Sequence, residues 1–182
     1  VIVSCGATIE WLKNNLGLFN DSKETAAMAM AVENNGGVYL VPAFSGLGSP
    51  HWQMDRRASL TGMSFSTQKN HIVRAALESI AYQIRDVVNA MEKDAGIALQ
   101  ELNADGGITA NTFVMQFLAD LLQKKVATIG MPDVSALGAA LLAGLKIGLY
   151  PDLESLKKMN RDQQYYVPGD NVEKGYEGWK EA

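Results

Sequence analysis

Short apolar runs alternate along the chain with longer segments whose apolar residues recur at helical spacing. The short runs predict strands, and the longer periodic segments predict amphipathic helices. The expected strands cover residues 1–5, 38–41, 59–64, 101–105 and 125–129, and the expected helices cover 7–16, 21–35, 69–93, 111–122, 132–147 and 151–159. Because strands alternate with helices, the pattern indicates an α/β domain built on a mixed sheet.

The longest predicted helix covers residues 69–93 and carries one continuous apolar stripe. The stripe consists of Ile72, Ala76, Ile80, Ile84, Val87, Val88 and Met91. Thr67 is the expected N-cap of this helix. Gly96 lies just beyond its expected end, where a left-handed glycine commonly closes a helix.

The predicted helix at 132–147 is unusual for its many small residues, which lie at 136–144. Glycine inside a helix costs about 1 kcal/mol relative to alanine, so we expect these small residues to let another backbone pack closely. After Pro151 the compact pattern gives way to one short helix and a polar, less regular tail. We therefore divide the chain into a main unit, 1–150, and a C-terminal helix and tail of the same domain, 151–182.

The composition fits a folded α/β protein and excludes several functional classes. Of the 182 residues, 47% are hydrophobic, which is enough for a sizeable core. The net charge is −4 and no cluster of lysine and arginine is present, so a nucleic-acid partner is not expected. Cys5, His51 and His71 are the only cysteine and histidines, and their spacing fits no metal site. One cysteine and no bilayer-spanning apolar run predict a cytoplasmic protein without a membrane partner.

A glycine pair provides the clearest candidate for chemistry. Asp105 ends a predicted strand, Gly106 and Gly107 follow, and a helical pattern begins within a few residues. Adjacent glycines allow a sharp turn and a close approach of another molecule to the backbone. The unpaired N–H groups and the positive dipole at a helix start attract anions. The segment is therefore either a phosphate site or a plain tight turn without a ligand.

Five segments in a fixed order resemble the C-terminal domain of the FGGY carbohydrate kinases, and the glycerol kinases are the most similar branch. The segments are Gly-Ala-Thr-Ile-Glu-Trp-Leu at 6–12, the Val-Pro-Ala-Phe…Pro-His-Trp segment at 41–52, the signature at 62–78, Asp-Gly-Gly…Asn at 105–111 and Ala-Leu-Gly-Ala-Ala at 136–140. The resemblance covers nearly all of 6–150 and is weaker through the tail.

The resemblance implies a ribonuclease-H-like fold of the actin, Hsp70 and hexokinase superfamily. It also implies transfer of the ATP γ-phosphoryl group, with Mg²⁺, to a hydroxyl of a small-molecule polyol or sugar, with glycerol as the expected acceptor. By position in the motifs, Gly6 and Glu10 line the nucleotide pocket. Gly106 and Gly107 approach the phosphates, and Asn111 reaches the adenine side.

The same resemblance places the catalytic aspartate of a Gly-Asp-Gln motif upstream of Val1, so no catalytic and no metal-binding residue is expected in this chain. The sequence starts with Val1, in what the pattern predicts as a strand, rather than with Met. We therefore expect a piece of a longer protein that is inactive alone, lacks its N-terminal domain and has a sheet cut at its N-terminal edge. Residues 162–164 (Asp-Gln-Gln) resemble that motif, but they follow Arg161 instead of glycine and are interpreted as a solvated turn.

Two departures from the family pattern leave alternatives open. Glu10 replaces a glutamine, and a carboxylate only accepts hydrogen bonds, so a contact donated by that amide is in doubt. His51 replaces the tyrosine of glycerol kinases, and Pro-His-Trp is closer to xylulokinases. A xylulokinase-like sugar kinase and a non-catalytic actin-like nucleotide-binding module are the alternatives. Family members commonly self-associate, so a homo-oligomer is possible.

A few other side chains receive structural expectations. Arg74 and Glu78 are four residues apart on the long helix, and such a pair contributes about 0.2–0.5 kcal/mol without implying chemistry. His71 lies in the first turn of that helix, where a capping or surface role is expected. Trp52 faces an interdomain cleft or is buried under its loop, and Asp105 is expected to hold the glycine loop by accepting backbone N–H bonds.

Overall fold

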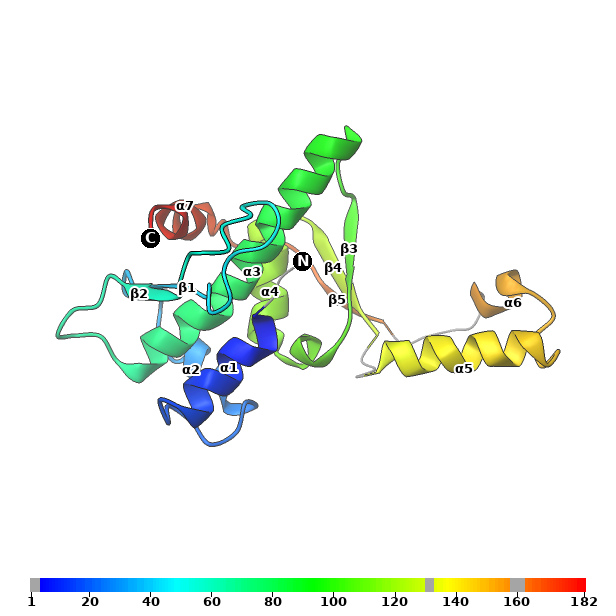
Figure 1. The fold of residues 1–182 in the computed structure, drawn as a ribbon, viewed down its shortest axis with the longest axis horizontal. Coiled ribbons are helices and arrows are strands. Elements are labelled where there is room, and N and C mark those ends of the chain that lie inside the picture. Colours follow the sequence, from blue (N-terminus) through cyan, green and yellow to red (C-terminus); the bar gives the residue numbers. More distant parts are fainter. Residues whose placement is uncertain (1–3, 130–132, 158–162) are drawn as a thin grey trace.

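The computed structural model describes residues 4–129, 133–157 and 163–182. A compact body contains most of these elements, and one helical arm projects from it (Figure 1). The helices are α1 (Cys5–Asn14), α2 (Glu24–Met30), α3 (Lys69–Ala95), α4 (Thr112–Leu122), α5 (Val134–Lys146), α6 (Leu153–Lys157) and α7 (Glu173–Glu181), and the 3₁₀ turn η1 covers Gly107–Ala110. The strands are β1 (Tyr39–Val41), β2 (Ser59–Thr61), β3 (Glu101–Ala104), β4 (Lys125–Thr128) and β5 (Gln164–Tyr166).

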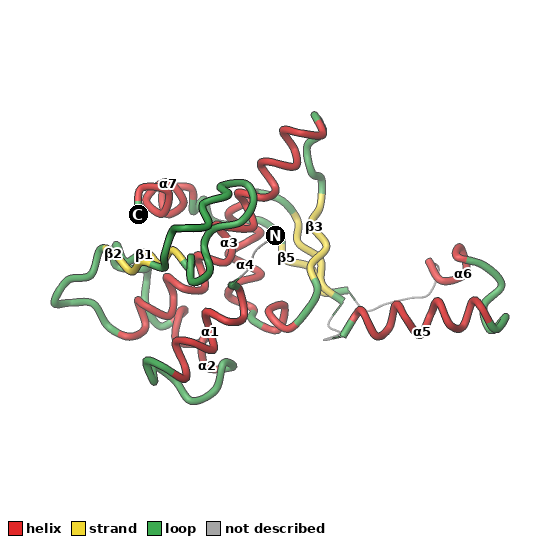
Figure 2. The backbone as a smooth tube through the Cα atoms, viewed as in Figure 1, coloured by secondary structure: helices red, strands yellow, loops and turns green. Residues whose placement is uncertain are grey.

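The strands form two small sheets, as the colouring of Figure 2 shows. In the three-stranded sheet, β3 pairs in parallel with β4, and β4 pairs with β5 in the antiparallel direction. The predicted mixed sheet is therefore confirmed. β1 and β2 form a separate antiparallel pair, with Leu40 opposite Leu60. The β3–α4–β4 unit is a crossover between parallel strands, so the loop at the end of β3 and the start of α4 lie together.

Helix α3 is the centre of the body, and α1, α2, α4, α7 and β1 all pack against it. Tyr82, which is 1% exposed, occupies the middle of this contact surface. Its ring lies 5.6 Å from the ring of Phe117 on α4 and 5.5 Å from that of Trp179 on α7. The indole of Trp179 also donates a hydrogen bond to the carbonyl of Leu40 at 2.8 Å. Aromatic packing and this bond therefore join the last helix to the first strand and to α3.

A buried polar cluster also holds the helices together. Glu78, which is 4% exposed, accepts hydrogen bonds from Arg74 (2.8 Å), Tyr82 (3.2 Å) and Asn35 (3.1 Å). Arg74 in turn donates to the carbonyls of Ala29 and Val32, near the end of α2. Desolvation raises the pKa of Glu78, against the opposing effects of Arg74 and the hydrogen bonds. The pair is therefore buried and bonded beyond its own helix, because Asn35, Ala29 and Val32 come from a distant segment of the chain.

Helix α3 begins at Lys69, as predicted, and ends at Ala95, two residues beyond the predicted end, but its N-cap is not the expected residue. Gln68, not Thr67, is the N-cap, and His71 accepts the N–H of Gln68 at 3.0 Å in a capping box. The expected capping role of His71 is therefore confirmed. The hydroxyl of Thr67 instead accepts the N–H of Ser64 at 2.8 Å, in the turn before the N-cap. Gly96 closes the helix in the left-handed conformation, with φ of 65°.

The expectation that another backbone packs closely on the small residues at 136–144 was wrong. These residues lie on α5, which with α6 forms an arm that projects from the body (Figure 1). Within α5 only Gly144 is buried, and the ring of Tyr150 packs on it rather than another backbone. A Cβ at Gly138 would meet no atom of the described residues within 4 Å. Leu142 is 63% exposed and Ile147 is 79% exposed, so apolar side chains of this arm face solvent in the described structure.

The C-terminal tail is more regular than predicted. β5 completes the three-stranded sheet, with Tyr166 opposite Val126, and α7 brings Tyr176 and Trp179 into the core. The split at residue 150 into a main unit and a tail stays a prediction. Gln164 begins β5, whereas Asp162 lies outside the described residues.

Two further expectations required correction. The strand predicted for residues 1–5 falls partly outside the described residues, and Cys5 already belongs to α1. Trp52 is 72% exposed, so the interpretation as a buried aromatic was wrong. None of the helices in the described ranges combines the length and the apolar character that a membrane crossing requires.

Candidate functional site

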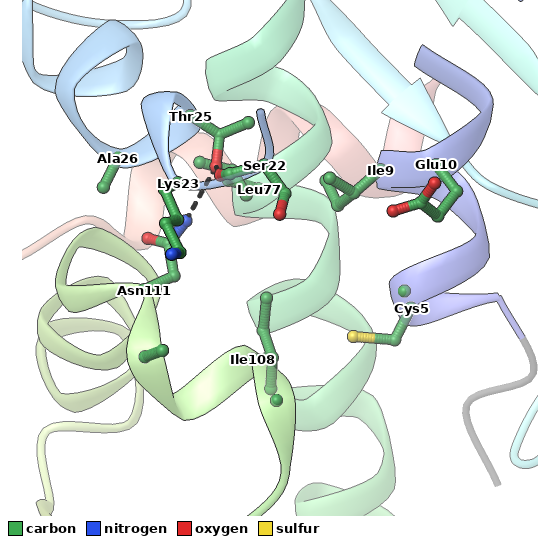
Figure 3. A pocket seen from close by; sticks show the side chains of 13 residues that line it. Cys5, Ile9, Glu10, Ser22, Lys23, Thr25, Ala26, Leu77, Ile108 and Asn111 are labelled. Carbon is green, nitrogen blue, oxygen red and sulfur yellow. Dashed lines mark hydrogen bonds between the residues drawn. The ribbon is translucent and has the colours of Figure 1, made fainter. Parts of the chain in front are cut away.

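A cavity of about 570 Å³ lies where α1, the turn before α2, α3 and η1 meet. Figure 3 shows its walls from close by. The lining residues are Cys5, Gly6, Ile9, Glu10, Ser22, Lys23, Thr25, Ala26, Leu77, Gly107, Ile108, Ala110 and Asn111. Four of the five residues predicted from the sequence are in this set, and the fifth, Gly106, directly precedes Gly107. The fold therefore brings two segments, about 100 residues apart in the sequence, to one hollow.

The glycine pair forms a turn at the cavity, and Gly107 lines it. Gly106 has φ of 89° and ψ of 176°, a backbone conformation that favours glycine. Its carbonyl accepts the N–H of Thr109 at 3.0 Å and the hydroxyl of Thr109 at 2.8 Å, which fixes the turn. Thr109 donates the first N–H bond of the turn, so the turn itself provides no acceptor for the N–H groups of Gly107 and Ile108. A Cβ at Gly107 would meet no atom within 4 Å, so the space beside its backbone is open.

Asp105 does not hold this loop. Its side chain is exposed, and in the described part of the chain its carboxylate accepts no backbone hydrogen bond. The loop is held instead by Thr109, whose hydroxyl donates to the carbonyl of Gly106, so the role predicted for Asp105 was wrong. Asp105 precedes the glycines and Thr109 follows them. The sequence alone does not show which of the two side chains bonds to the loop.

Asn111 connects the two halves of the cavity. Its Oδ1 accepts the N–H of Val114 at 3.1 Å and thereby caps α4. Its Nδ2 donates to the hydroxyl of Thr25 at 3.0 Å, and that hydroxyl donates to the carbonyl of Ser22 at 2.6 Å. An amide nitrogen carries two protons, so one remains available to a ligand in the cavity. The side chain is thus fixed before any ligand arrives.

Helix α1 provides the opposite wall through residues on one helical face. In the part of the chain that the structure describes, a Cβ added at Gly6 would meet no atom within 4 Å, which leaves the first turn of this helix open to a ligand. Glu10 is exposed and accepts a hydrogen bond from Asn14 at 3.2 Å. Burial raises the pKa of the Cys5 thiol, which keeps it protonated at neutral pH.

Sequence reasoning missed Ser22 and Lys23, which form the part of the wall before α2. These residues belong to a turn without periodicity, and no motif marks them. The turn is held locally: Glu24 accepts the N–H of Asp21 at 2.8 Å, and Asp21 accepts the N–H of Lys23 at 2.9 Å. Such bonds between neighbours explain why the helix starts at Glu24 rather than at Asp21.

The described lining of the cavity suits the binding of a ligand better than catalysis. Its polar groups are backbone N–H groups, one amide, two hydroxyls, one thiol and one charge of each sign, set among apolar side chains. Among the described residues that line it, no histidine or second carboxylate could act as a general base beside Glu10. In the described part of the chain, no three His, Cys, Asp or Glu side chains gather in a way that could hold a metal ion. The arrangement is typical of a binding site for an anionic ligand with an apolar part.

Comparison with known proteins gives one consistent family. The model of the FGGY family of carbohydrate kinases, C-terminal domain, matches residues 1–147. A glycerol kinase of Shewanella piezotolerans is 46% identical over 180 residues, which is 97% of this chain and 36% of that protein. Glycerol kinase 1 of Thermotoga maritima is 48% identical over 184 residues, which is 100% of this chain and 37% of that protein. The chain thus spans little more than a third of the length of these relatives.

Solved structures show the same fold. The crystal structure of Plasmodium falciparum glycerol kinase with ADP has a TM-score of 0.87 and 38% sequence identity, and covers 99% of this chain and 36% of that chain. A xylulose kinase from Rhodospirillum rubrum has a TM-score of 0.77 and 28% identity, and covers 97% of this chain and 37% of that chain. The predicted α/β fold of the actin- and hexokinase-like type is thereby confirmed.

Proposed function

The chain belongs to the FGGY family of carbohydrate kinases, and on that basis we propose that it is the ATP-binding C-terminal part of a polyol kinase. The whole protein would transfer the γ-phosphoryl group of ATP to a hydroxyl of glycerol. The relatives that match at 46% and 48% identity are named glycerol kinases, whereas the xylulose kinase matches at 28%. This difference favours glycerol over the alternative of a ketose.

One observation carries the proposal. One cavity is lined both by α1, through Gly6 and Glu10, and by the η1 region, through Gly107 and Asn111. Its volume of about 570 Å³ lies within the range of about 300–1,000 Å³ typical of small-molecule sites. Residues chosen from two separate sequence motifs would not share a cavity of this size if the motifs were unrelated turns.

The residues present divide the work of holding a nucleotide. The N–H groups of Gly107 and Ile108 point from the start of a helical turn and suit a phosphate oxygen. Asn111, fixed by Thr25 and by its own helix, offers one amide proton to the adenosine part. Ile9 and Leu77 supply apolar surface for the base.

Catalysis then depends on parts of the protein outside this chain. Phosphoryl transfer requires a group that accepts the hydroxyl proton, and charges that stabilise the phosphates. The described residues hold no suitable carboxylate cluster, so we assign Mg²⁺ to the phosphates of ATP rather than to side chains of this chain. The 182 residues by themselves are expected to be inactive. A cytoplasmic location, which suits an ATP-dependent enzyme, is part of the proposal.

The substitution Gly107→Val tests the proposal in the full-length protein. The added side chain would fill open space beside the backbone, so it should weaken ATP and ADP binding while leaving the thermal unfolding temperature unchanged. Titration calorimetry with ADP measures the binding, and phosphorylation of glycerol and a panel of ketoses measures the activity. Gly169→Val is the matched control, because a Cβ there meets only Asp120 at an ordinary 3.6 Å. Unchanged nucleotide affinity in folded Gly107→Val protein would contradict the assignment.

A further inference from the structure

Two opposite charges face each other across the cavity. Glu10 projects from α1 on one wall, and Lys23 lies on the opposite wall, before α2, as Figure 3 shows. Among the described residues, the carboxylate of Glu10 has a partner on its own helix alone, Asn14. Within the described ranges, the ammonium of Lys23 takes part in no ion pair or side-chain hydrogen bond. Both charged groups are therefore available to a ligand that lies between the walls.

The two groups demand different atoms from that ligand. A carboxylate only accepts hydrogen bonds, and an ammonium only donates them. The ligand must therefore present donors towards Glu10 and acceptors towards Lys23. A glutamine at position 10 would behave differently, because its amide can donate and accept together. A glutamine amide can therefore accept from the 6-amino group of adenine and donate to its N7. A carboxylate can accept from the amino group but cannot donate to N7.

Guanine carries a matching set of atoms. Its N1–H and its 2-amino group are adjacent donors that can form two parallel bonds to one carboxylate. Its O6 and N7 are adjacent acceptors on the neighbouring edge, and an ammonium can donate hydrogen bonds to both. Adenine offers Glu10 only the 6-amino group as a donor at its base edge, so one of the two carboxylate oxygens stays without a partner from the base.

We propose that Glu10 and Lys23 determine the base preference of this nucleotide site, and that the site binds guanine nucleotides about as well as adenine nucleotides. The inference rests on the proposed function, because it requires the cavity to hold a nucleotide. It also requires the base to lie between α1 and the turn before α2. Phosphate groups directed to Gly107, which lines the cavity beside η1, leave that space for the base.

The test compares ADP with GDP in the full-length protein by titration calorimetry, for the unaltered protein and for Glu10→Gln, Lys23→Met and the control Glu33→Gln. Glu33 is an exposed carboxylate that does not line the cavity. The dissociation constants of the unaltered protein for GDP and ADP should agree within about tenfold. Glu10→Gln should shift their ratio by about tenfold or more in favour of ADP, because one good bidentate pair to a base gives discrimination of that order. Lys23→Met should weaken GDP binding several-fold, and Glu33→Gln should change neither constant.

The outcomes separate this inference from the proposed function. If ADP binds and GDP does not, or if Glu10→Gln leaves the ratio of the two constants unchanged, the base preference is set elsewhere and the inference is overturned. If neither nucleotide binds, the proposed function fails together with the inference. Binding of ADP that is lost in Gly107→Val, with a ratio insensitive to Glu10, would support the function and refute the inference alone.

Discussion

Removal of the Glu78 carboxylate is the most informative test of how this domain is held together. In Glu78→Ala, three donors lose their acceptor at once: Arg74, Tyr82 and Asn35. The side chain of Arg74 is only 15% exposed, so water cannot readily replace the lost partner. Its guanidinium keeps the carbonyls of Ala29 and Val32, but it loses the only negative charge in the cluster.

The expected magnitude follows from the burial of the pair. Breaking a buried ion pair by truncating one partner costs about 3–5 kcal/mol, because a buried charge stays uncompensated. An exposed pair four residues apart on a helix contributes about 0.2–0.5 kcal/mol. The structure therefore predicts a loss of unfolding free energy roughly tenfold larger than the sequence spacing of Arg74 and Glu78 suggests.

The measurement is a double-mutant cycle of Arg74→Ala and Glu78→Ala, with urea unfolding followed by tryptophan fluorescence. The buried Trp179 provides a signal from the core. We expect a coupling energy of about 1–3 kcal/mol, the range for residues in one hydrogen-bonded network. The matched control is the pair Glu154–Lys157, whose side chains are 66% and 71% exposed. Its cycle should give a coupling energy near the exposed-pair value of about 0–1 kcal/mol.

The reasoning would be refuted by a coupling energy for Arg74 and Glu78 that equals that of the exposed control pair. The same conclusion would follow if Glu78→Ala cost less than about 1 kcal/mol, the size of one ordinary hydrogen bond. A large cost for Glu78→Ala with a small coupling energy would place the stabilisation in the bonds to Tyr82 and Asn35 instead of the ion pair.

The remaining predictions concern the last helix and the end of α3. Trp179→Ala should lower the unfolding free energy by about 3–5 kcal/mol, because the indole is buried and bonded to Leu40; an effect below 1 kcal/mol in urea unfolding would show that α7 is not part of the core. The pKa of Glu92 is lowered from 4.5, first by the N–H of Leu99 and then by Lys124, so its contribution to stability is present above pH 4.5 and is lost as the pH falls through the lowered value. Glu92→Gln should therefore flatten the acid limb of a stability–pH curve, and an unchanged limb would argue against the Leu99 contact.

Local periodicity predicted most elements of the body, because their apolar residues face one core. The predicted segment at 38–41 became β1, that at 101–105 became β3, and that at 111–122 became α4, each within a residue or so of its expected bounds. The end of α3 at Gly96 was also correct, since a left-handed glycine is visible in the sequence as a strong stop signal.

The errors concern interactions between distant segments. The burial of Glu78 depends on Asn35, 43 residues away, which no local pattern shows. The tail was predicted as irregular although Val172, Tyr176 and Trp179 have the spacing of a buried helical face, and this signal could have been used. The small residues of α5 were taken as evidence for close packing, but composition alone does not state which surface a helix meets.

The candidate site was predicted through motifs rather than through periodicity. Gly6, Glu10, Gly107 and Asn111 were placed by their order in the family pattern, and the structure gathers them around one cavity. Lys23 was missed because a turn fixed by neighbouring side chains carries no repeat. Its position opposite Glu10 depends on how α1 and α2 pack against α3, which is a tertiary property.

The projecting arm has a practical consequence for anyone who prepares these 182 residues. Leu142, Ile147, Leu149 and Leu153 lie on it with their apolar surfaces in water. Such a surface retains a protein on hydrophobic resins and binds fluorescent dyes that report exposed hydrophobic patches. It also promotes aggregation when a sample is concentrated. Charged substitutions confined to this arm should improve the yield of soluble sample without disturbing the candidate site, because the cavity lies in the body of the molecule.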